Sequence, residues 1–294
     1  MSFKHTTLAI TLNSLLCISA VADAAYLERA QDLDYFYFGQ RGLGLNQNGT
    51  ADTDFGQLQP VSDNGVSLER YGQGQVGVSS AAGSSTASAT QQLSIFPTDL
   101  ARTTYLIDSF AGLTGSGAYS ADGVNVTVKN DAFDQPAYAD VWLQQSFRIL
   151  PGPGESDGQA VRISISADTF LHYGGSDARL VQDAILDGLP GSPFKITYNG
   201  ADLVTLPGAI HTGQNIYSGS FVGQIGDIIG FEGPTVFAHL TLPNVTFNSG
   251  EDWQVNVMAG FYGSVGVTPV PESETWAMLL VGLGLVGWAL RRHG

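Results

Sequence analysis

The chain has 294 residues, of which 43% are hydrophobic and only 13% are charged, with 37 glycines and a formal net charge of −15. With 12 basic against 27 acidic residues, nucleic-acid binding is excluded, because it needs basic side chains that displace counterions from phosphate. The same negative charge disfavours binding to anionic membrane surfaces. The composition favours short strands and turns over exposed helices, which are rich in Glu, Lys and Arg.

The first 24 residues are typical of an export signal. A basic N-terminal segment precedes the mostly apolar, uncharged stretch 8–21, which is short for a membrane span. The small residues Ala22 and Ala24 then form a cleavage site, so we expect cleavage before Ala25. The single cysteine of the chain lies inside this segment, and the mature protein is therefore expected to have no disulfide.

Three segments near the start of the body have distinctive compositions. Tyr35-Phe36-Tyr37-Phe38 is predicted to form a core strand. In the next segment, Asp52 and Asp54 are weak calcium candidates, but their spacing matches no complete calcium motif. We therefore expect no bound metal and no cofactor. Residues 79–92 contain mostly Ser, Ala, Thr and Gly, and are predicted to form a flexible loop or an edge strand.

The remaining body alternates apolar and polar residues with the period of a β-strand. This alternation predicts strands in 124–128, 137–149, 161–168, 236–242 and 253–261. One short helix is expected, with Ser176 as N-cap and Gly188 and Pro190 as its stop. Many strands, one helix and no strand–helix alternation predict an all-β fold, with a single β-sandwich of jelly-roll type over residues 25–268.

One strand carries a candidate binding face. In 137–149 the odd positions are apolar, whereas the even positions include the following side chains: Tyr138, Asp140, Trp142, Gln144 and Arg148. An exposed indole beside hydrogen-bonding groups is suited to stacking on a sugar ring, so this face is a candidate carbohydrate site. A hairpin through 150–159 would add three residues to it: Arg162, Ser164 and Asp168. The alternative is that Trp142 is covered by another sheet or loop, since tryptophan is highly buried on average.

The C-terminal segment, 269–294, contains a candidate membrane helix. The uncharged run 276–290 reaches about 22 Å as a helix, short of a hydrocarbon core of roughly 30 Å. A tryptophan lies near each end of the run, where indoles prefer the membrane interface. Arg291 and Arg292 should stay cytoplasmic, which places the body outside.

This tail resembles a PEP-CTERM sorting signal, a motif also known as the ice-binding protein C-terminal domain. The resemblance is carried by Val270-Pro271-Glu272-Ser273, by the apolar run and by the two terminal arginines. In that family a Pro-Glu-Pro motif, an apolar helix and a basic cluster are recognised by the membrane protease-transpeptidase exosortase. Ser273 stands where the family has its second proline. The alternative is an ordinary C-terminal anchor.

The resemblance implies a Gram-negative bacterium that makes exopolysaccharide. It implies a protein that is anchored in the inner membrane, processed by exosortase, and delivered to the cell surface or the extracellular matrix. We therefore expect a structural or adhesive protein of the cell surface or biofilm that associates with exopolysaccharide and is not an enzyme. One alternative is a dedicated carbohydrate-binding module that uses the Trp142 face. Another is a polysaccharide hydrolase, for which the sequence singles out no carboxylate pair.

Overall fold

The structure, a computed structural model, describes residues 24–270 with several gaps, together with parts of the C-terminal tail. The gaps are residues 42, 55, 60, 129–136, 177–193, 207–212 and 241, and the described tail residues are 280–283, 288, 291 and 292. In the described body the regular structure is β-strand, apart from the short 3-10 helix η1 (Gln31–Leu33). The predicted all-β class is therefore confirmed.

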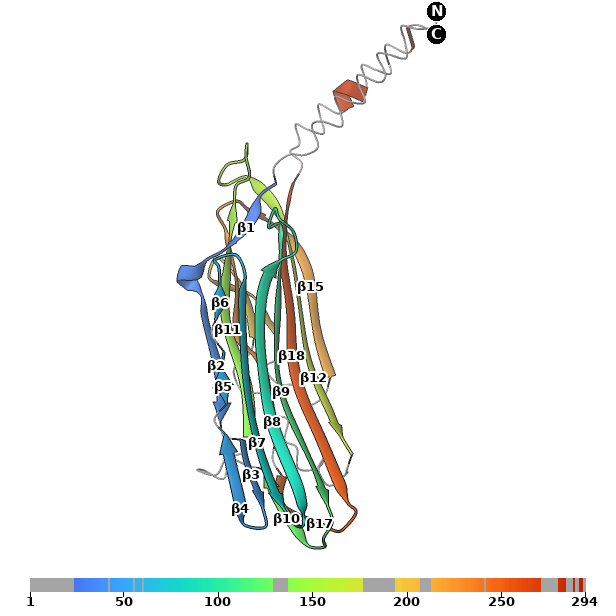
Figure 1. The fold of residues 1–294 in the computed structure, drawn as a ribbon. Helices are drawn as coiled ribbons and strands as arrows, with labels where there is room; N and C mark the ends of the chain where they lie inside the picture. Colours follow the sequence, from blue (N-terminus) through green and yellow to red (C-terminus); the bar gives the residue numbers. More distant parts are fainter. Residues whose placement is uncertain are drawn as a thin grey trace, which may run out of the picture.

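The larger of two layers is an eight-stranded antiparallel sheet, which we call the large sheet (Figure 1). Its six long strands lie in the order β15 (Gly213–Gln224), β12 (Ala160–Gly175), β18 (Asp252–Pro269), β9 (Thr104–Tyr119), β8 (Gly83–Pro97) and β7 (Leu68–Ser80). At the β7 edge two short strands pair with β7, namely β5 (Gln57–Leu58) and β6 (Ser62–Asp63).

The second layer is built from two smaller antiparallel sheets. In the six-stranded sheet, β1 (Tyr26–Arg29) and β2 (Tyr35–Arg41) pair with β11 (Ala137–Leu150), followed by β16 (Ile228–Leu240), β13 (Phe194–Tyr198) and β14 (Ala201–Leu206). The four-stranded sheet has the order β17 (Leu242–Phe247), β10 (Val124–Val128), β3 (Leu43–Gln47) and β4 (Thr50–Asp54).

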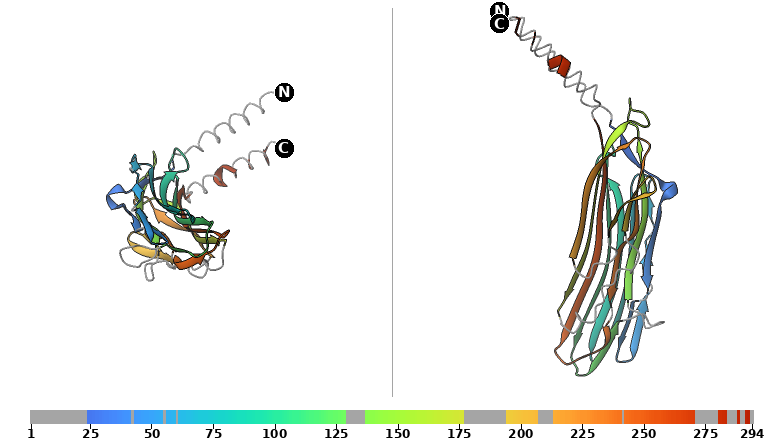
Figure 2. Two further views of the ribbon diagram at one scale, coloured as in Figure 1. Left: turned by 60° about the horizontal axis from the view of Figure 1, so that its bottom comes forward. Right: turned by 180° about the vertical axis from the view of Figure 1, so that it is seen from behind.

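The four-stranded sheet prolongs the six-stranded sheet along the same chain segments. Residue 42 alone separates β2 from β3, and residue 241 alone separates β16 from β17. The strand order β2, β11, β16 of one sheet is repeated as β3, β10, β17 in the other. Together they form one long layer opposite the large sheet, and the molecule is an elongated, sandwich-like stack (Figure 2).

The core fills the space between the layers. In β18 the side chains of Trp253, Val255 and Val257 are at most 2% exposed, and they alternate with exposed polar residues as the sequence predicts. The strands predicted at 124–128 and 161–168 are β10 and the first half of β12, and both bury their apolar positions. Buried side chains of all three sheets form one hydrophobic cluster.

Residues 79–92 are not a flexible loop or an edge strand, and that prediction is wrong. They form the end of β7, a two-residue turn, and the first ten residues of β8, which pairs with β7 on one side and β9 on the other. Their small side chains alternate between the two faces of β8: Ser85, Ala87 and Ala89 are buried, whereas Ser84 and Thr86 are exposed. On the neighbouring β9, a Cβ at Gly115 or Gly117 would overlap the buried Trp253 ring, so the sheet needs small residues beneath that indole.

The hairpin through 150–159 that would have added three residues to the Trp142 face does not form. β11 pairs with β16, β2 and β1, whereas β12 pairs with β15 and β18, so the two strands lie in opposite layers. The segment between them crosses from one layer to the other instead of closing a turn. Arg162, Ser164 and Asp168 therefore lie on the large sheet, away from Trp142.

Several sequence predictions lie outside the described residues. These are the signal segment up to residue 23 with its Ala22, the helix expected after Ser176, and Pro271, Glu272 and Ser273 of the sorting motif. Val270 directly follows β18, and Arg291 and Arg292 are exposed helical residues. Among the residues that the structure describes, no helix is both long and apolar enough to cross a membrane.

Candidate functional site: an aromatic surface on the six-stranded sheet

The candidate strand β11 buries one face and presents the other outward, as its alternation predicts. Its inward side chains are at most 1% exposed: Ala139, Val141, Leu143, Phe147 and Ile149. Trp142 and Gln144 therefore project from the opposite, outer face of the sheet. There Trp142 is half-buried and Gln144 is exposed.

The neighbouring strand β2 places two tyrosines beside these residues. Tyr37 is the register partner of Trp142, and Tyr35 is the partner of Gln144. Their side chains are 49% and 56% exposed. Because directly opposed residues have Cβ atoms about 5 Å apart, the three aromatic residues are neighbours on this face. We call Tyr35, Tyr37, Trp142 and Gln144 the aromatic surface.

The two tyrosines correct the prediction of a simple core strand at 35–38. Phe38 is 5% exposed and Phe36 packs against the core, so only the phenylalanines face inward. The sequence does indicate which rings face outward, because Tyr and Phe alternate in this segment and only tyrosine carries a hydroxyl that favours contact with water.

Hydrogen-bonding groups border the aromatic surface on its other side. On β16, the partner of Gln144 is Glu232, which is exposed, and Lys195 of β13 is in turn the partner of Glu232. The Lys195 ammonium forms an ion pair with Asp202, with the two atoms 2.8 Å apart. Amide, carboxylate and ammonium groups thus follow one another across the sheet beside the rings.

The other predicted site residues lie along the same strand but are not all part of this surface. Asp140 is half-buried opposite Gly39, one step beyond Trp142. Tyr138 is in β11, but its side chain lies outside the described residues. Arg148 lies at the far end, where it forms an ion pair of 2.7 Å with Asp32 of η1.

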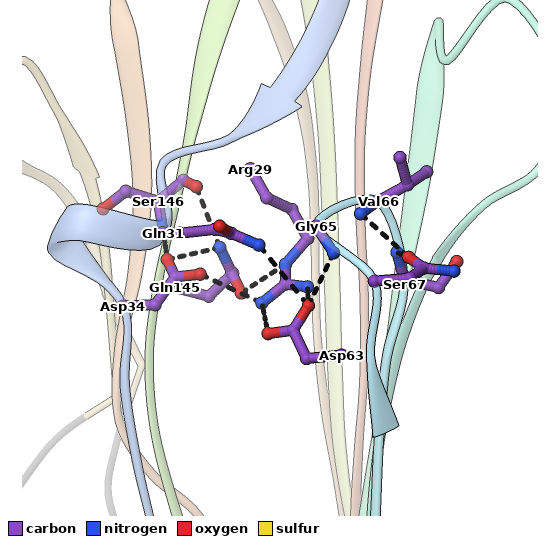
Figure 3. Close-up of polar contacts among 10 residues, drawn as sticks. Arg29, Gln31, Asp34, Asp63, Gly65, Val66, Ser67, Gln145 and Ser146 are labelled. Atoms are coloured by element: carbon purple, nitrogen blue, oxygen red, sulfur yellow. Dashed lines mark hydrogen bonds and ion pairs between the residues drawn. The ribbon is translucent and has the colours of Figure 1, made fainter. Parts of the chain in front are cut away.

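A buried ionic group fixes the start of β2 against β11 (Figure 3). Arg29 donates to Asp34 at 3.0 Å, to Asp63 at 2.9 Å and to the Gln145 Oε1 atom at 3.2 Å. Gln145 Nε2 donates to Asp34 at 2.6 Å, and the Ser146 N–H donates to the same carboxylate. We call Arg29, Asp34, Asp63 and Gln145 the Arg29 cluster.

The position of the Arg29 cluster in the chain gives it a role in building the aromatic surface. Asp34 directly precedes Tyr35, and Gln145 directly follows Gln144. The cluster therefore holds the first residue of β2 in register with β11. Asp63 belongs to β6 of the large sheet, so the same cluster also ties the two layers together.

The two carboxyl groups of the Arg29 cluster differ in their electrostatics. Burial raises the pKa of Asp34 above its ordinary value, although the hydrogen bonds from Ser146, Arg29 and Gln145 act in the other direction. Burial also acts to raise the pKa of Asp63, but hydrogen bonds from Arg29 and from the Gly65 N–H outweigh it and lower that pKa. Asp34 is thus the carboxyl group of the cluster whose charged form burial penalises on balance.

A second contact fixes β2 from its inner side. The guanidinium carbon of Arg70, on β7 of the large sheet, lies 5.2 Å from the Phe36 ring centre and 4.7 Å from that of Phe38. Such cation–π contacts favour a defined ring geometry. The strand that carries both tyrosines is therefore held at its start and along its inner face.

Asp52 and Asp54, the calcium candidates, serve a structural purpose in β4. The Gly77 N–H donates to Asp52 at 3.3 Å, and the Gln75 N–H donates to Asp54 at 3.0 Å. These carboxylates supply acceptors to the edge of β7, where the backbone would otherwise lack partners. In the described part of the chain no group of three or more His, Cys, Asp or Glu side chains could hold a metal ion.

No protein-family model, curated protein or solved structure matches this chain. The aromatic surface and the signals at the two ends of the sequence are therefore the features that indicate a function. The exposed tyrosine rings and the half-buried Trp142 ring offer flat apolar faces to the C–H side of a sugar. The Gln144 amide and the Glu232 carboxylate can bond its hydroxyl groups.

Proposed function

We propose that this protein is an exported component of the cell surface or biofilm matrix, and that it associates with exopolysaccharide through the aromatic surface. The observation that carries the proposal is the juxtaposition of Tyr35, Tyr37 and Trp142 on the outer face of adjacent strands. Contiguous exposed apolar groups on a soluble domain mark interaction sites. The proposal assigns the protein a binding and structural role and no catalytic one.

The firm positioning of the strand that carries both tyrosines supports binding over a purely architectural role. The Arg29 cluster and Arg70 hold β2 from two sides, although Tyr35 and Tyr37 themselves contribute little to the core. A strand whose backbone is already held in place loses little conformational freedom when a ligand binds to its side chains, which favours affinity. A dedicated carbohydrate-binding module is the second candidate, and it would use the same surface.

We further propose that one jelly-roll-like body lies between a signal peptide and an exosortase-processed tail with a membrane helix. Three links support this topology, since β9 to β10, β11 to β12 and β17 to β18 each connect opposite layers. The positions of the two ends of the body are also consistent with this arrangement. The Leu27 N–H donates to Arg102 O and the Val267 N–H to Thr103 O, so both ends leave from one end of the sandwich.

That arrangement gives the anchored form a defined orientation. Before exosortase acts, the inner membrane would hold the sandwich by the end that contains the start of β1 and the end of β18. The aromatic surface runs along the side of the six-stranded sheet and so remains accessible. Mass spectrometry of the exported protein tests the sorting proposal, with an N-terminus at Ala25 and loss of the terminal arginines as the expected result. An intact tail would contradict it.

Affinity electrophoresis tests the binding proposal. The purified protein is run through gels that contain the exopolysaccharide of the producing bacterium, beside Tyr37→Ala and Trp142→Ala. Each variant is expected to bind several-fold more weakly, because it removes one of the flat apolar faces on which a sugar ring would stack. Leu203→Ala removes a side chain that is 40% exposed on β14 of the same sheet, and it serves as control. Unchanged retardation of both aromatic variants would contradict the proposal.

A further inference from the structure

The outer face of the large sheet carries a second set of rings. In β18 the side chains of Ala259 and Phe261 face the core, with 6% and 0% exposed, so Gly260 and Tyr262 face outward. Tyr262 is 50% exposed. On β12, Phe170 is the register partner of Gly260 and projects from the same outer face.

Phe170 and Tyr262 form a stacked aromatic pair on this face. Their ring centres are 5.4 Å apart, and the ring planes differ by 20°. The Phe170 ring occupies the space that a Cβ at residue 260 would need, so glycine at this position allows the ring to reach across the neighbouring strand. The aromatic pair therefore depends on glycine at position 260, where any side chain would displace the Phe170 ring.

Carboxylates flank this pair on both sides. Tyr262 is the register partner of Asp108 on β9 and of Asp168 on β12. Burial raises the pKa of Asp108, so its charged form gains from a cationic neighbour. Farther along the same row lie Ser94 and Glu69, and none of the described residues in the row is basic.

The next row offers hydroxyl groups beside the rings. Ser166 and Ser264 are register partners on β12 and β18, and their hydroxyl oxygens are 2.7 Å apart. A ligand that lies across this face therefore meets flat rings, hydroxyls and negative charge together. Polysaccharides that carry amino groups combine the three matching features, which are sugar C–H faces, hydroxyls and ammonium ions.

We propose that the Phe170–Tyr262 pair, with Asp108 and Asp168 beside it, binds a polysaccharide segment that carries protonated amino groups, so that one molecule links two polysaccharide chains. This inference rests on the proposed function of the aromatic surface, which supplies the other contact. The two surfaces lie on the outer faces of opposite layers, so one ligand does not block the other. The net charge of −15 also favours a cationic polymer over an anionic one.

Calorimetry with two short probes tests the second site on the purified full-length protein. One probe is a β-1,4-linked N-acetylglucosamine oligosaccharide that has been partly deacetylated, and the other is its fully acetylated form. The deacetylated probe is expected to bind twice per chain, and the acetylated probe once. Tyr262→Ala should remove one of the two sites, and Asp108→Asn should weaken that site up to about fivefold, as for an exposed ion pair.

The variants separate this inference from the proposed function. Trp142→Ala should also leave one site, but it should be the site that prefers the deacetylated probe. If Tyr262→Ala leaves the number of sites unchanged, the inference fails. If Trp142→Ala leaves the number of sites unchanged, the proposed function fails instead.

Light scattering with a long, partly deacetylated polymer tests the linking itself. The native protein is expected to make the mixture turbid, whereas Tyr262→Ala and Trp142→Ala should each bind the polymer and leave it clear. Turbidity that persists in both variants would overturn the inference. So would a dimer of the native protein that forms without sugar and is lost in Tyr262→Ala, because the face would then bind a second copy of this chain.

Discussion

Arg29→Met is expected to lower the free energy of unfolding by about 3–5 kcal/mol, the usual cost of breaking a buried ion pair from one side. Methionine replaces the apolar stem of arginine and removes its charge, so the variant isolates the ionic contribution. Asp34 is left with its carboxylate in the interior. The Gln145 amide still donates to that carboxylate, but no cation remains beside it.

The magnitude follows from the exposure of each partner. The Arg29 and Asp34 side chains are 1% and 7% exposed, so water cannot replace the lost contact between them. The Asp63 side chain is 30% exposed and can recover hydration, so it adds less to the cost. Asp34 therefore accounts for most of the expected loss of unfolding free energy. Its pKa, already raised by burial, should rise further in the variant.

Equilibrium unfolding in urea, followed by circular dichroism, measures the effect. Arg148→Met is the matched control, because Arg148 pairs with Asp32 across 2.7 Å while both side chains are well exposed, at 39% and 62%. An exposed pair of this kind contributes about 0–1 kcal/mol. The double variant Arg29→Met with Asp34→Asn should be more stable than Arg29→Met alone, because it removes the stranded charge. Equal shifts for the two arginine variants, or no recovery in the double variant, would refute the reasoning.

Two further predictions concern packing and pH. Gly117→Ala should lower the free energy of unfolding by about 1–3 kcal/mol, because its Cβ would overlap the buried Trp253 ring. Gly77→Ala is the control, since its Cβ makes only ordinary van der Waals contacts. Equal urea midpoints for the two variants would contradict this prediction. Burial acts to raise the pKa of Asp227, but hydrogen bonds from the Tyr198 hydroxyl and from other donors outweigh it and lower that pKa. The charged carboxylate therefore stabilises the fold above about pH 4, the ordinary pKa of an aspartate. This contribution disappears as the pH falls through the lowered pKa of the folded protein. Asp227→Asn should therefore be less stable than the native protein near neutral pH and converge with it in acid, and a gap that is independent of pH in urea unfolding would contradict this assignment.

Sequence alternation was enough to predict which face of β10, β11, β18 and the first half of β12 is buried. The inward set on β11 and the burial of Trp253 follow directly from a period of two, because neighbouring side chains of a strand point to opposite faces. Strand partners could not be predicted in the same way. Turn residues in 151–159 indicate that the chain changes direction, but they do not show that it crosses to the other layer.

The candidate site was predicted only in part for the same reason. Trp142 and Gln144 could be placed on the outer face from their own strand, but Tyr35 and Tyr37 join them through a pairing that spans about a hundred residues of sequence. The Phe170–Tyr262 pair was missed because its geometry depends on Gly260 of the adjacent strand. Both surfaces arise from register between distant strands, which a local pattern does not encode.

The most direct test of the central claim is a fluorescence titration of the purified protein with the exopolysaccharide, compared with Trp142→Phe. A sugar ring that stacks on Trp142 should exclude water from its indole and shift its emission to shorter wavelength. Trp142→Phe keeps an aromatic ring, so it should still bind the polysaccharide but lose the shift. A shift of the same size in Trp142→Phe, or binding by the native protein without any shift, would contradict the account.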